Sequence, residues 1–224
     1  MIPIGLFDDL PAAAAATHEP LAPGAVLLRG FAHGMEADLL QAIGAVTAQA
    51  PLRHMQTPGG YTMSVATTSC GALGWVSDQR GYRYAAHDPV SNRAWPAMPS
   101  CFLDLAQRAA QEAGYAGFAP ESCLINIYAP DAKLSLHQDK DEKDLAAPIV
   151  SVSLGLPAVF LFGTSNRKDR PQRYRLVHGD VVVWGGPSRL AFHGVMPLAD
   201  GEHVLLGRRR INLTFRSPRL TAAP

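Results

Sequence analysis

The 224-residue sequence is poor in cysteine, in net charge and in long hydrophobic runs. Its three cysteines are widely spaced and form no Cys-x-x-Cys pair, which argues against a disulfide framework or a structural zinc site. Lys and Arg outnumber Asp and Glu by 20 to 19, so the chain is no histone-like polycation. The most apolar run, residues 149–162, is too short to span a membrane and contains Ser, Gly and Pro. We therefore expect a cytoplasmic protein that does not enter a membrane.

Hydrophobic residues make up 47% of the chain, which is an ordinary level for a globular protein with a sizeable core. Two stretches, residues 36–50 and 100–113, space their apolar residues three and four apart and predict helices. A proline follows the first stretch and Gly114 ends the second. Between them, residues 52–98 interleave Gly and Pro with aromatic side chains, which predicts short hairpins and loops.

From residue 122 onward, short β-branched or apolar runs follow one another, separated by Gly and Pro. Such a series predicts the strands of a sandwich or jelly roll. The runs cover residues 123–128, 133–139, 149–154, 158–162, 174–177, 180–184, 189–195 and 210–216.

Two His-x-Asp triplets occur in different contexts. His137 and Asp139 end an apolar run, where side chains two apart point the same way and can reach one ion. The triplet at 178–180 has a Gly-Asp pair between two strand-like runs, which is more typical of a hairpin turn. The best third ligand is His193, held in an apolar run further along the chain. Two His and one carboxylate match the facial triad of non-haem Fe(II) oxygenases, the alternative being a metal-free surface pair at 137–139.

The strand expected at 210–216 places four polar side chains on one face: Arg210, Asn212, Thr214 and Arg216. By itself this pattern also fits an edge strand with a solvated face. The strand expected at 123–128, however, likewise places Asn126 and Tyr128 on one face. Guanidinium, amide and phenol donors suit a small dicarboxylate, because Arg binds carboxylates in a planar fork. Beside a facial-triad iron, they predict 2-oxoglutarate as the co-substrate for O₂ activation.

Several longer motifs point to one family. They are TPGGYTMSVA (57–66), LGW (73–75), WPAMP (95–99), NIYAPDAKLSLHQDKDE (126–142), APIVSVSLGLPA (147–158), HGDVVVWGG (178–186) and RINLTFR (210–216). Together they resemble the AlkB-type DNA repair dioxygenases, enzymes dependent on Fe(II) and 2-oxoglutarate that remove alkyl groups from bases. The resemblance runs from about residue 21 to residue 216.

The resemblance implies a mainly β fold, a double-stranded β-helix (jelly roll) with flanking N-terminal helices and a nucleotide-recognition lid. We expect a single dioxygenase domain at 21–216, with the lid at about 52–98 and the catalytic core at about 122–216. A mobile N-terminal segment at 1–20 and a C-terminal tail at 217–224 would flank it.

The resemblance also assigns the site residues. It implies that Fe(II) is bound by His137, Asp139 and His193. It implies that 2-oxoglutarate is held by Asn126, Tyr128, Arg210, Asn212 and Arg216, with Arg210 on the distal carboxylate.

The expected reaction is oxidative demethylation, by direct reversal, of N-alkylated bases such as 1-methyladenine and 3-methylcytosine. The partner would be alkylated single- or double-stranded DNA, and also RNA, with release of formaldehyde, succinate and CO₂. A duplex base must be flipped out to reach buried iron. Trp75, Tyr82 and Tyr84 are therefore candidates for stacking on it, the alternative being packing within the lid. Asp141 would face a cationic methylated base if the strand continues past Asp139, with Glu142 pointing outward.

A local basic run lies at 167–175. Its members are Arg167, Lys168, Arg170, Arg173 and Arg175. We expect these residues, Arg167 among them, to contact the nucleic-acid backbone, the alternative being a solvated hairpin loop. Because the whole chain is nearly neutral, we expect weak, distributive binding by a monomer.

Three other functions stay open at this point. The same dioxygenase chemistry could act on RNA, a protein or a small molecule. A jelly-roll nucleic-acid-binding module with core histidines would bind neither iron nor 2-oxoglutarate. A zinc hydrolase would leave the polar face of the 210–216 strand without a purpose.

Overall fold

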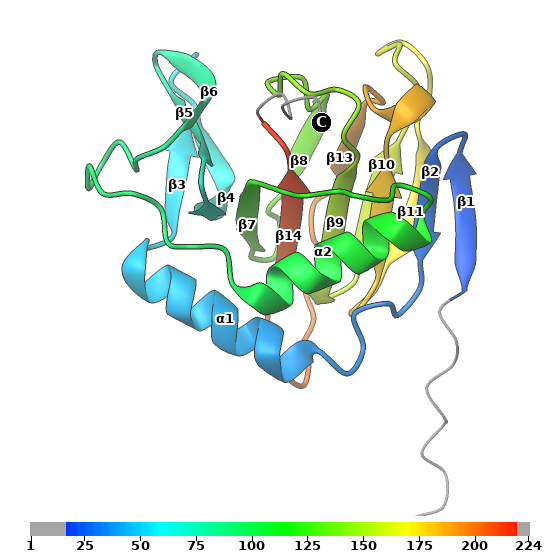
Figure 1. Cartoon of the computed structure of the whole chain (residues 1–224), viewed down its shortest axis with the longest axis horizontal. Helices are drawn as coiled ribbons and strands as arrows, with labels where there is room; N and C mark the ends of the chain where they lie inside the picture. Colours follow the sequence, from blue (N-terminus) through cyan, green and yellow to red (C-terminus); the bar gives the residue numbers. More distant parts are fainter. Residues whose placement is uncertain (1–16, 219–224) are drawn as a thin grey trace, which may run out of the picture.

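The structure, a computed structural model, describes residues 17–218. This part of the chain consists mainly of antiparallel strands and two helices (Figure 1). Residues 1–16 and 219–224, which include most of the expected N-terminal segment and C-terminal tail, lie outside it. Strand β1 (His18–Ala22) begins inside the segment expected to be mobile and pairs with the next strand.

Two facing sheets form the body of the described chain. In spatial order the eight-stranded sheet contains β1, β2 (Ala25–Leu28), β12 (Val181–Trp184), β9 (Ile149–Gly155), β14 (Arg210–Arg216), β7 (Ser122–Tyr128), β4 (Thr62–Gly71) and β3 (Arg53–Gln56). The four-stranded sheet contains β11 (Gln172–Leu176), β10 (Ala158–Phe162), β13 (His193–Val195) and β8 (Leu134–His137). Between the sheets, Phe160 and Phe162 pack against Trp184. The expected jelly roll is thus confirmed.

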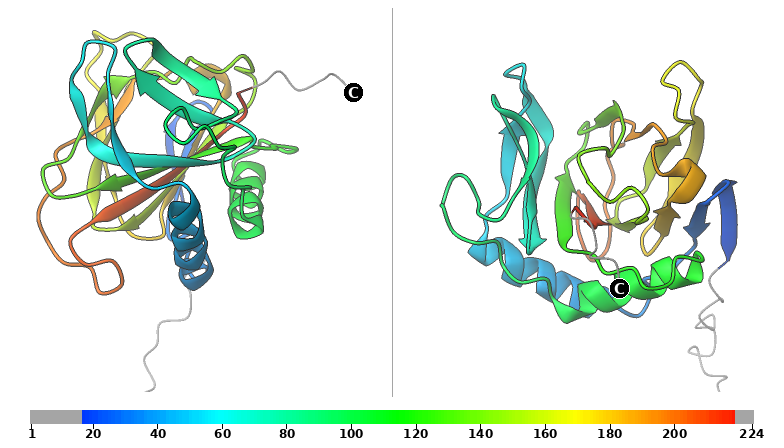
Figure 2. Two further views of the ribbon diagram at one scale, coloured as in Figure 1. Left: turned by 90° about the vertical axis from the view of Figure 1, so that its left-hand side faces the viewer. Right: turned by 45° about the horizontal axis from the view of Figure 1, so that its top comes forward.

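Helices α1 (Glu36–Gln49) and α2 (Ser100–Glu112) lie along the other face of the large sheet (Figures 1 and 2). They bury the apolar residues whose spacing predicted them, and Phe102 of α2 meets Phe215 of β14 edge to face. Both expected helices are confirmed. No helix among the described residues is long and apolar enough to cross a membrane.

Strand β14 lies between β9 and β7, and every one of its residues is buried. Its Ile211, Leu213 and Phe215 pack in the core beneath the helices. The polar residues of β14 therefore face the space between the two sheets, because side chains alternate along a strand. The alternative of a solvated edge strand is excluded by this central position.

Two strand boundaries differ from expectation. The run at 189–195 forms a strand only from His193, because a short 3₁₀ helix, η1 (Gly186–Ser188), and a turn occupy the chain before it. The run at 133–139 ends its pairing at His137, and residues 138–148 form an irregular loop.

The stretch at 52–98 divides between two sheets. Strands β3 and β4 extend the large sheet, whereas β5 (Gly74–Asp78) and β6 (Gly81–Ala85) form a separate hairpin, here called the lid hairpin (Figure 2). Buried Trp95 supports this hairpin, because it packs against Val76 and donates a hydrogen bond from Nε1 to the Ala85 carbonyl at 2.9 Å.

Candidate metal and co-substrate site

A cavity of about 780 Å³ opens between the two sheets and the lid hairpin. All eight residues expected at the metal and co-substrate sites line it: His137, Asp139, His193, Asn126, Tyr128, Arg210, Asn212 and Arg216. Four of the five expected substrate contacts line it as well: Trp75, Tyr82, Asp141 and Arg167. Residues that are far apart in the sequence thus meet at one place.

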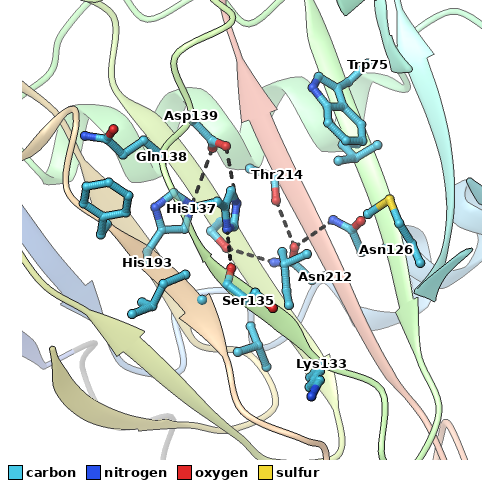
Figure 3. Close-up of a pocket in the computed structure, with 18 of the residues that line it drawn as sticks. Trp75, Asn126, Lys133, Ser135, His137, Gln138, Asp139, His193, Asn212 and Thr214 are labelled. Atoms are coloured by element: carbon cyan, nitrogen blue, oxygen red, sulfur yellow. Dashed lines mark hydrogen bonds and ion pairs between the residues drawn. The ribbon is translucent and has the colours of Figure 1, made fainter. Parts of the chain in front are cut away.

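The candidate metal ligands lie at the ends of two paired strands. His137 ends β8, His193 begins β13, and the two residues are direct partners across the strands. Their Nε2 atoms lie 3.6 and 3.7 Å from the two carboxylate oxygens of Asp139 (Figure 3). One ligand atom from each of the three residues falls within 4.8 Å of the others, a spacing at which all three can bind one ion.

Close approach of β13 to β8 depends on Gly194. A Cβ atom at this position would lie 2.7 Å from the Leu134 carbonyl oxygen and 3.2 Å from the Leu136 nitrogen. A side chain at 194 would therefore force the strands apart and separate the two imidazoles. The glycine next to His193 is part of what builds the site.

Backbone carbonyls fix the tautomers of both imidazoles. His137 Nδ1 lies 2.9 Å from the Ser135 carbonyl oxygen, and His193 Nδ1 lies 3.0 Å from that of Ala191. Because a carbonyl can only accept, each Nδ1 carries a hydrogen, and Nε2 is the ring nitrogen that can bind a metal. Burial, and next the neighbouring His137 ring, lower the pKa of His193 to about 4, so this ring is neutral at pH 7.

Asp139 is ionised because Arg216 compensates for its burial. Burial raises the pKa of the Asp139 carboxyl, but the Arg216 guanidinium and the two imidazoles outweigh it, and the pKa lies well below its ordinary value. Arg216 donates from Nε to Asp139 Oδ2 at 2.8 Å, and its Nη2 lies 2.7 Å from the same oxygen. The site therefore offers two imidazole Nε2 atoms and one carboxylate anion, the donor set of a facial-triad iron.

The floor of the cavity is a network of polar side chains from β7, β9 and β14. Asn126 Nδ2 donates to Asn212 Oδ1 at 3.1 Å, and Asn212 Nδ2 donates to Ser151 Oγ at 2.8 Å (Figure 3). Thr214 Oγ1 donates to the same Asn212 oxygen at 2.8 Å. These bonds hold the amide groups of Asn126 and Asn212 in fixed orientations along the floor.

Arg210 is a buried cation without an anionic partner in the described chain. Only 1% of the residue is exposed, and its guanidinium lies 4.9 Å from the centre of the Tyr128 ring. Nη2 donates to Ser153 Oγ at 2.8 Å, whereas Nε and Nη1 make no hydrogen bond within residues 17–218. Burial lowers the pKa of Arg210. A carboxylate would supply the missing acceptors and charge, so the residues present fit a dicarboxylate beside the metal.

Comparison with known proteins agrees with this geometry. Residues 24–216 match the family model of the 2OG-Fe(II) oxygenase superfamily. The chain belongs to this superfamily. The oxygenase is 61% identical over 208 residues to alpha-ketoglutarate-dependent dioxygenase AlkB of Salmonella typhimurium, a match that covers 93% of this chain and 96% of that protein. The AlkB-type resemblance of the motifs is thereby confirmed, and with it the use of Fe(II), 2-oxoglutarate and O₂.

Two further relatives extend the comparison. The solved structure of OsALKBH1 superposes on the oxygenase with a TM-score of 0.79 at 29% identity and covers 90% of this chain and 100% of that one. The tRNA demethylase abh1 of Schizosaccharomyces pombe is 31% identical over 160 residues, which cover 66% of this chain and 53% of that protein.

The lid hairpin presents an aromatic pair to the cavity of the oxygenase. Trp75 and Tyr82 stack with their ring centres 5.5 Å apart and an angle of 13° between the planes. Trp75 Nε1 donates to Asp141 Oδ2 at 3.0 Å. Tyr84 does not line this cavity, and its hydroxyl instead donates to Glu142 Oε1 at 2.5 Å.

Expectations for Asp141 and Glu142 need correction. Asp141 does face the cavity, but strand alternation is not the reason, because β8 ends at His137. Glu142 was expected to point outward, and this was wrong, because it is 6% exposed and forms an ion pair with Arg189 at 3.0 Å. No sequence signal singled out Arg189, since its partners lie more than 40 positions away along the chain.

The basic run divides into two parts. Arg167 Nη1 donates to the Leu136 carbonyl at 3.0 Å, and its guanidinium lies 5.5 Å from the Phe192 ring centre, at the cavity. Arg173 and Arg175 are exposed on β11, which is an edge strand of the four-stranded sheet.

Two other sequence features have clear places in the structure. Gly179 of the second His-x-Asp triplet has a left-handed φ of +84° in a turn, and buried Asp180 binds Arg29, which confirms the expected turn. Tyr61, 79% exposed, lines the cavity from the tip of the β3–β4 hairpin. The TPGGYTMSVA motif and its Pro58-Gly59-Gly60 turn pointed to this segment but did not assign Tyr61 to the cavity.

Proposed function

We propose that the protein oxidatively removes N-alkyl groups from nucleic-acid bases such as 1-methyladenine and 3-methylcytosine. The products are the repaired base, formaldehyde, succinate and CO₂, and the substrates are single- or double-stranded DNA and also RNA. The observation that carries this function is the convergence, in one cavity, of the His137–Asp139–His193 ligand atoms and the unpaired Arg210 guanidinium. The names of its relatives, a dioxygenase AlkB and a tRNA demethylase, support a nucleic-acid substrate.

The residues around the cavity divide the work of binding. His137, Asp139 and His193 would hold the iron, where O₂ would serve as the oxidant and 2-oxoglutarate as the electron-donating co-substrate for hydroxylation of the N-methyl carbon. Arg210 binds the distal carboxylate of 2-oxoglutarate. Asn126, Tyr128 and Asn212 contact the rest of it, and Arg216 orients Asp139 while flanking the co-substrate.

The lid hairpin holds the base. A flipped base stacks on Trp75, with Tyr82 behind that ring, and this stacking compensates for the lost pairing. Trp75 Nε1 holds the Asp141 carboxylate at the cavity, where its charge attracts the cationic rings of 1-methyladenine and 3-methylcytosine. Tyr84 contributes to substrate binding indirectly, by fixing the hairpin on Glu142.

Arginines at the cavity mouth and on β11 contact the phosphate backbone. Arg167 lies at the cavity, and the exposed Arg173 and Arg175 extend the positive surface along the edge strand. We propose that this nearly neutral protein works as a cytoplasmic monomer with weak, distributive binding to its substrate. The unpaired state of all three cysteines supports a reducing compartment. A single dioxygenase domain at 21–216, with its lid at about 52–98, accounts for all these contacts.

Formaldehyde release from defined lesions tests the function. The enzyme would be loaded anaerobically with Fe(II) and 2-oxoglutarate and then given O₂ with oligonucleotides that each carry one lesion. Single-stranded DNA, duplex DNA, RNA and a methylated peptide form the four arms. We expect turnover with the nucleic acids and none with the peptide. Turnover of the peptide alone would favour the protein-substrate alternative.

The metal assignment has its own variant. Asp139→Ala removes the carboxylate of the ligand set, so we expect formaldehyde release to fall at least ~100-fold, in line with the importance of ligand sets at metal centres. Near wild-type release by this variant would contradict the metal role of Asp139.

A further inference from the structure

A buried carboxylate outside the metal site connects the lid hairpin to the loop that carries Asp139. The Glu142 side chain is 2% exposed. Its Oε1 accepts from the Tyr84 hydroxyl of β6 at 2.5 Å, and its Oε2 accepts from Arg189 Nη2 at 3.0 Å. Both oxygens are therefore engaged, one by the lid and the other by the body of the protein.

Arg189 fixes the path of the 138–148 loop. Its Nη1 donates to the Asp139 carbonyl at 2.6 Å, and its Nε donates to the Ala147 carbonyl at 2.9 Å. The buried guanidinium thus holds both ends of a loop that has no regular secondary structure. With Glu142 as its counter-ion, Arg189 sets where the backbone of Asp139 lies.

Arg216 connects the same carboxylate to the metal ligand itself. Its Nε lies 2.8 Å from Asp139 Oδ2 and 3.5 Å from Glu142 Oε1. The buried cluster therefore contains two guanidiniums and two carboxylates, so its formal charges balance. Without the negative charge of Glu142, the cluster would carry one uncompensated buried positive charge beside Asp139. The Arg216 guanidinium would then shift from its present position.

The lid hairpin contacts this loop twice. Trp75 of β5 donates to Asp141, and Tyr84 of β6 donates to Glu142. Each strand of the hairpin thus sends one hydrogen bond to the four-residue segment that begins with Asp139. A change in the position of the hairpin must therefore reach the metal ligand through this segment.

We propose that Glu142 is a positioning residue, a buried carboxylate through which Tyr84 of the lid hairpin holds Asp139 in its metal-binding orientation. The inference rests on the proposed role of Asp139 as an iron ligand. Glu142 touches neither metal nor substrate in this role. Because coupling between sites is reciprocal, the metal must stabilise the contact between the lid hairpin and this segment by the same factor by which the contact strengthens metal binding.

Tyr84→Phe tests the connection with the smallest change, the loss of one hydroxyl. The probe is Mn(II), a redox-stable stand-in for Fe(II), titrated into the metal-free enzyme by calorimetry. We expect the Mn(II) dissociation constant to rise roughly three- to tenfold, as for loss of one hydrogen bond behind a metal ligand. The matched control is Tyr115→Phe, whose hydroxyl donates to the Gly24 carbonyl at 2.7 Å, away from the site, and should change the constant less than twofold.

Two further measurements separate positioning from general destabilisation. In a Glu142→Gln background, Tyr84→Phe should have no additional effect on Mn(II) affinity, because the connection is already broken. Hydrogen exchange of the amides in β5 and β6 should slow on Mn(II) binding in the wild type and stay unchanged in Tyr84→Phe.

Each outcome bears on the inference. The inference is overturned if the Tyr84→Phe variant binds Mn(II) as tightly as the wild type. It is also overturned if Tyr84→Phe still lowers Mn(II) affinity by the full factor in the Glu142→Gln background. If Glu142→Gln does not fold, the comparison of Tyr84→Phe with Tyr115→Phe decides together with the exchange data. The Asp139→Asn variant separates the proposed metal site from the proposed role of Glu142. If Asp139→Asn still binds Mn(II), the metal site itself is overturned. If Tyr84→Phe leaves Mn(II) affinity unchanged, only the role of Glu142 is overturned.

Discussion

At the scale of single residues, the two arginines of β14 illustrate how neighbours decide function. Burial lowers the pKa of both, but only Arg216 has carboxylates close enough to reverse the effect, so its pKa is raised while that of Arg210 is lowered. Arg216 is therefore satisfied by the protein, and Arg210 is left to be satisfied by a ligand. The sequence pattern alone made the two residues equivalent.

Replacing Arg210 should separate binding from stability. Arg210→Met removes a buried cation that has no anionic partner within residues 17–218. We therefore expect the unfolding free energy of the ligand-free protein to rise by about 1 kcal/mol or more, and its unfolding temperature to rise as well. The same variant should raise the KM for 2-oxoglutarate at least ~10-fold, because a charge-assisted carboxylate contact is lost. Thermal unfolding and succinate formation would measure the two effects. An unchanged KM would contradict the assignment of Arg210 to the co-substrate.

The candidate metal ligands could be predicted from the sequence, whereas the residues that position them could not. His137 and Asp139 lie two apart at the end of an apolar run, so local spacing alone brought them together. Glu142 and Arg189 meet only because an irregular loop folds back on the turn after β12. No local periodicity encodes such a contact.

At the scale of elements, the pairing of β8 with β13 brings the two imidazoles together. Gly194→Ala should push the strands apart, because its Cβ would lie 2.7 Å from a backbone oxygen. We expect weaker Mn(II) binding, at least ~3-fold, and a loss of about 1–3 kcal/mol of unfolding free energy. Gly44→Ala in α1 is the control, since nothing lies within 4 Å of its Cβ and a helix favours Ala. Equal Mn(II) affinity in the two variants would show that strand spacing does not control the site.

An ion pair behind the lid hairpin makes the unfolding free energy of the protein depend on pH. Arg53 forms an ion pair with buried Asp88. Burial raises the pKa of the Asp88 carboxyl, but this ion pair and other hydrogen bonds outweigh burial and lower the pKa to about 2. Since this pKa is lower in the folded than in the unfolded state, the stabilisation is fully present above about pH 5 and lost as the pH falls toward 2. Asp88→Asn should therefore lower the unfolding free energy by about 1–2 kcal/mol at pH 7 and by progressively less below pH 4. Urea unfolding at pH 7, 5 and 3 would measure this, and a gap independent of pH would contradict the ion-pair explanation.

The kinds of elements were predictable where one face of each is buried in the core. Both helices and β14 have regular apolar spacing, and the structure confirms them. The late start of β13 was missed because Leu190, Ala191 and Phe192 continue the apolar run through a turn. The end of β8 was missed because the two-residue spacing of His137 and Asp139 also fits a continuing strand.

At the scale of the whole molecule, two exposed arginines lie together at one edge of a nearly neutral protein. Arg173 and Arg175 lie exposed on the edge strand β11, on the sheet that also carries His137 and His193. The double variant Arg173→Gln, Arg175→Gln should weaken binding to all oligonucleotides alike and reduce the slope of log K against log salt by about 1.4 for single strands and about 1.8 for duplex DNA. Arg208→Gln is the control, because this exposed arginine pairs with Asp200 within the connection between β13 and β14, away from β11. An unchanged slope would place the phosphate contacts elsewhere.

The overall arrangement of the strands could be predicted from the family motifs better than from local apolar patterns in the sequence. Residues 52–98 resembled one lid segment, yet β3 and β4 complete the large sheet and only β5 and β6 stand apart. Which strands pair is decided by long-range register between β4 and β7, and a single sequence does not display such register.

The carbonyls that orient His137 and His193 belong to residues two positions earlier in the chain. Every amino acid possesses this oxygen, so substitution at 135 or 191 leaves the donor-to-carbonyl contact chemically available. Ala191 is itself buried in the core, so packing constrains its side chain, whereas its contact with Nδ1 of His193 is made by the backbone alone. The tautomer of each imidazole, which decides whether Nε2 can bind a metal, is therefore set by backbone atoms and not by the side chains at 135 and 191.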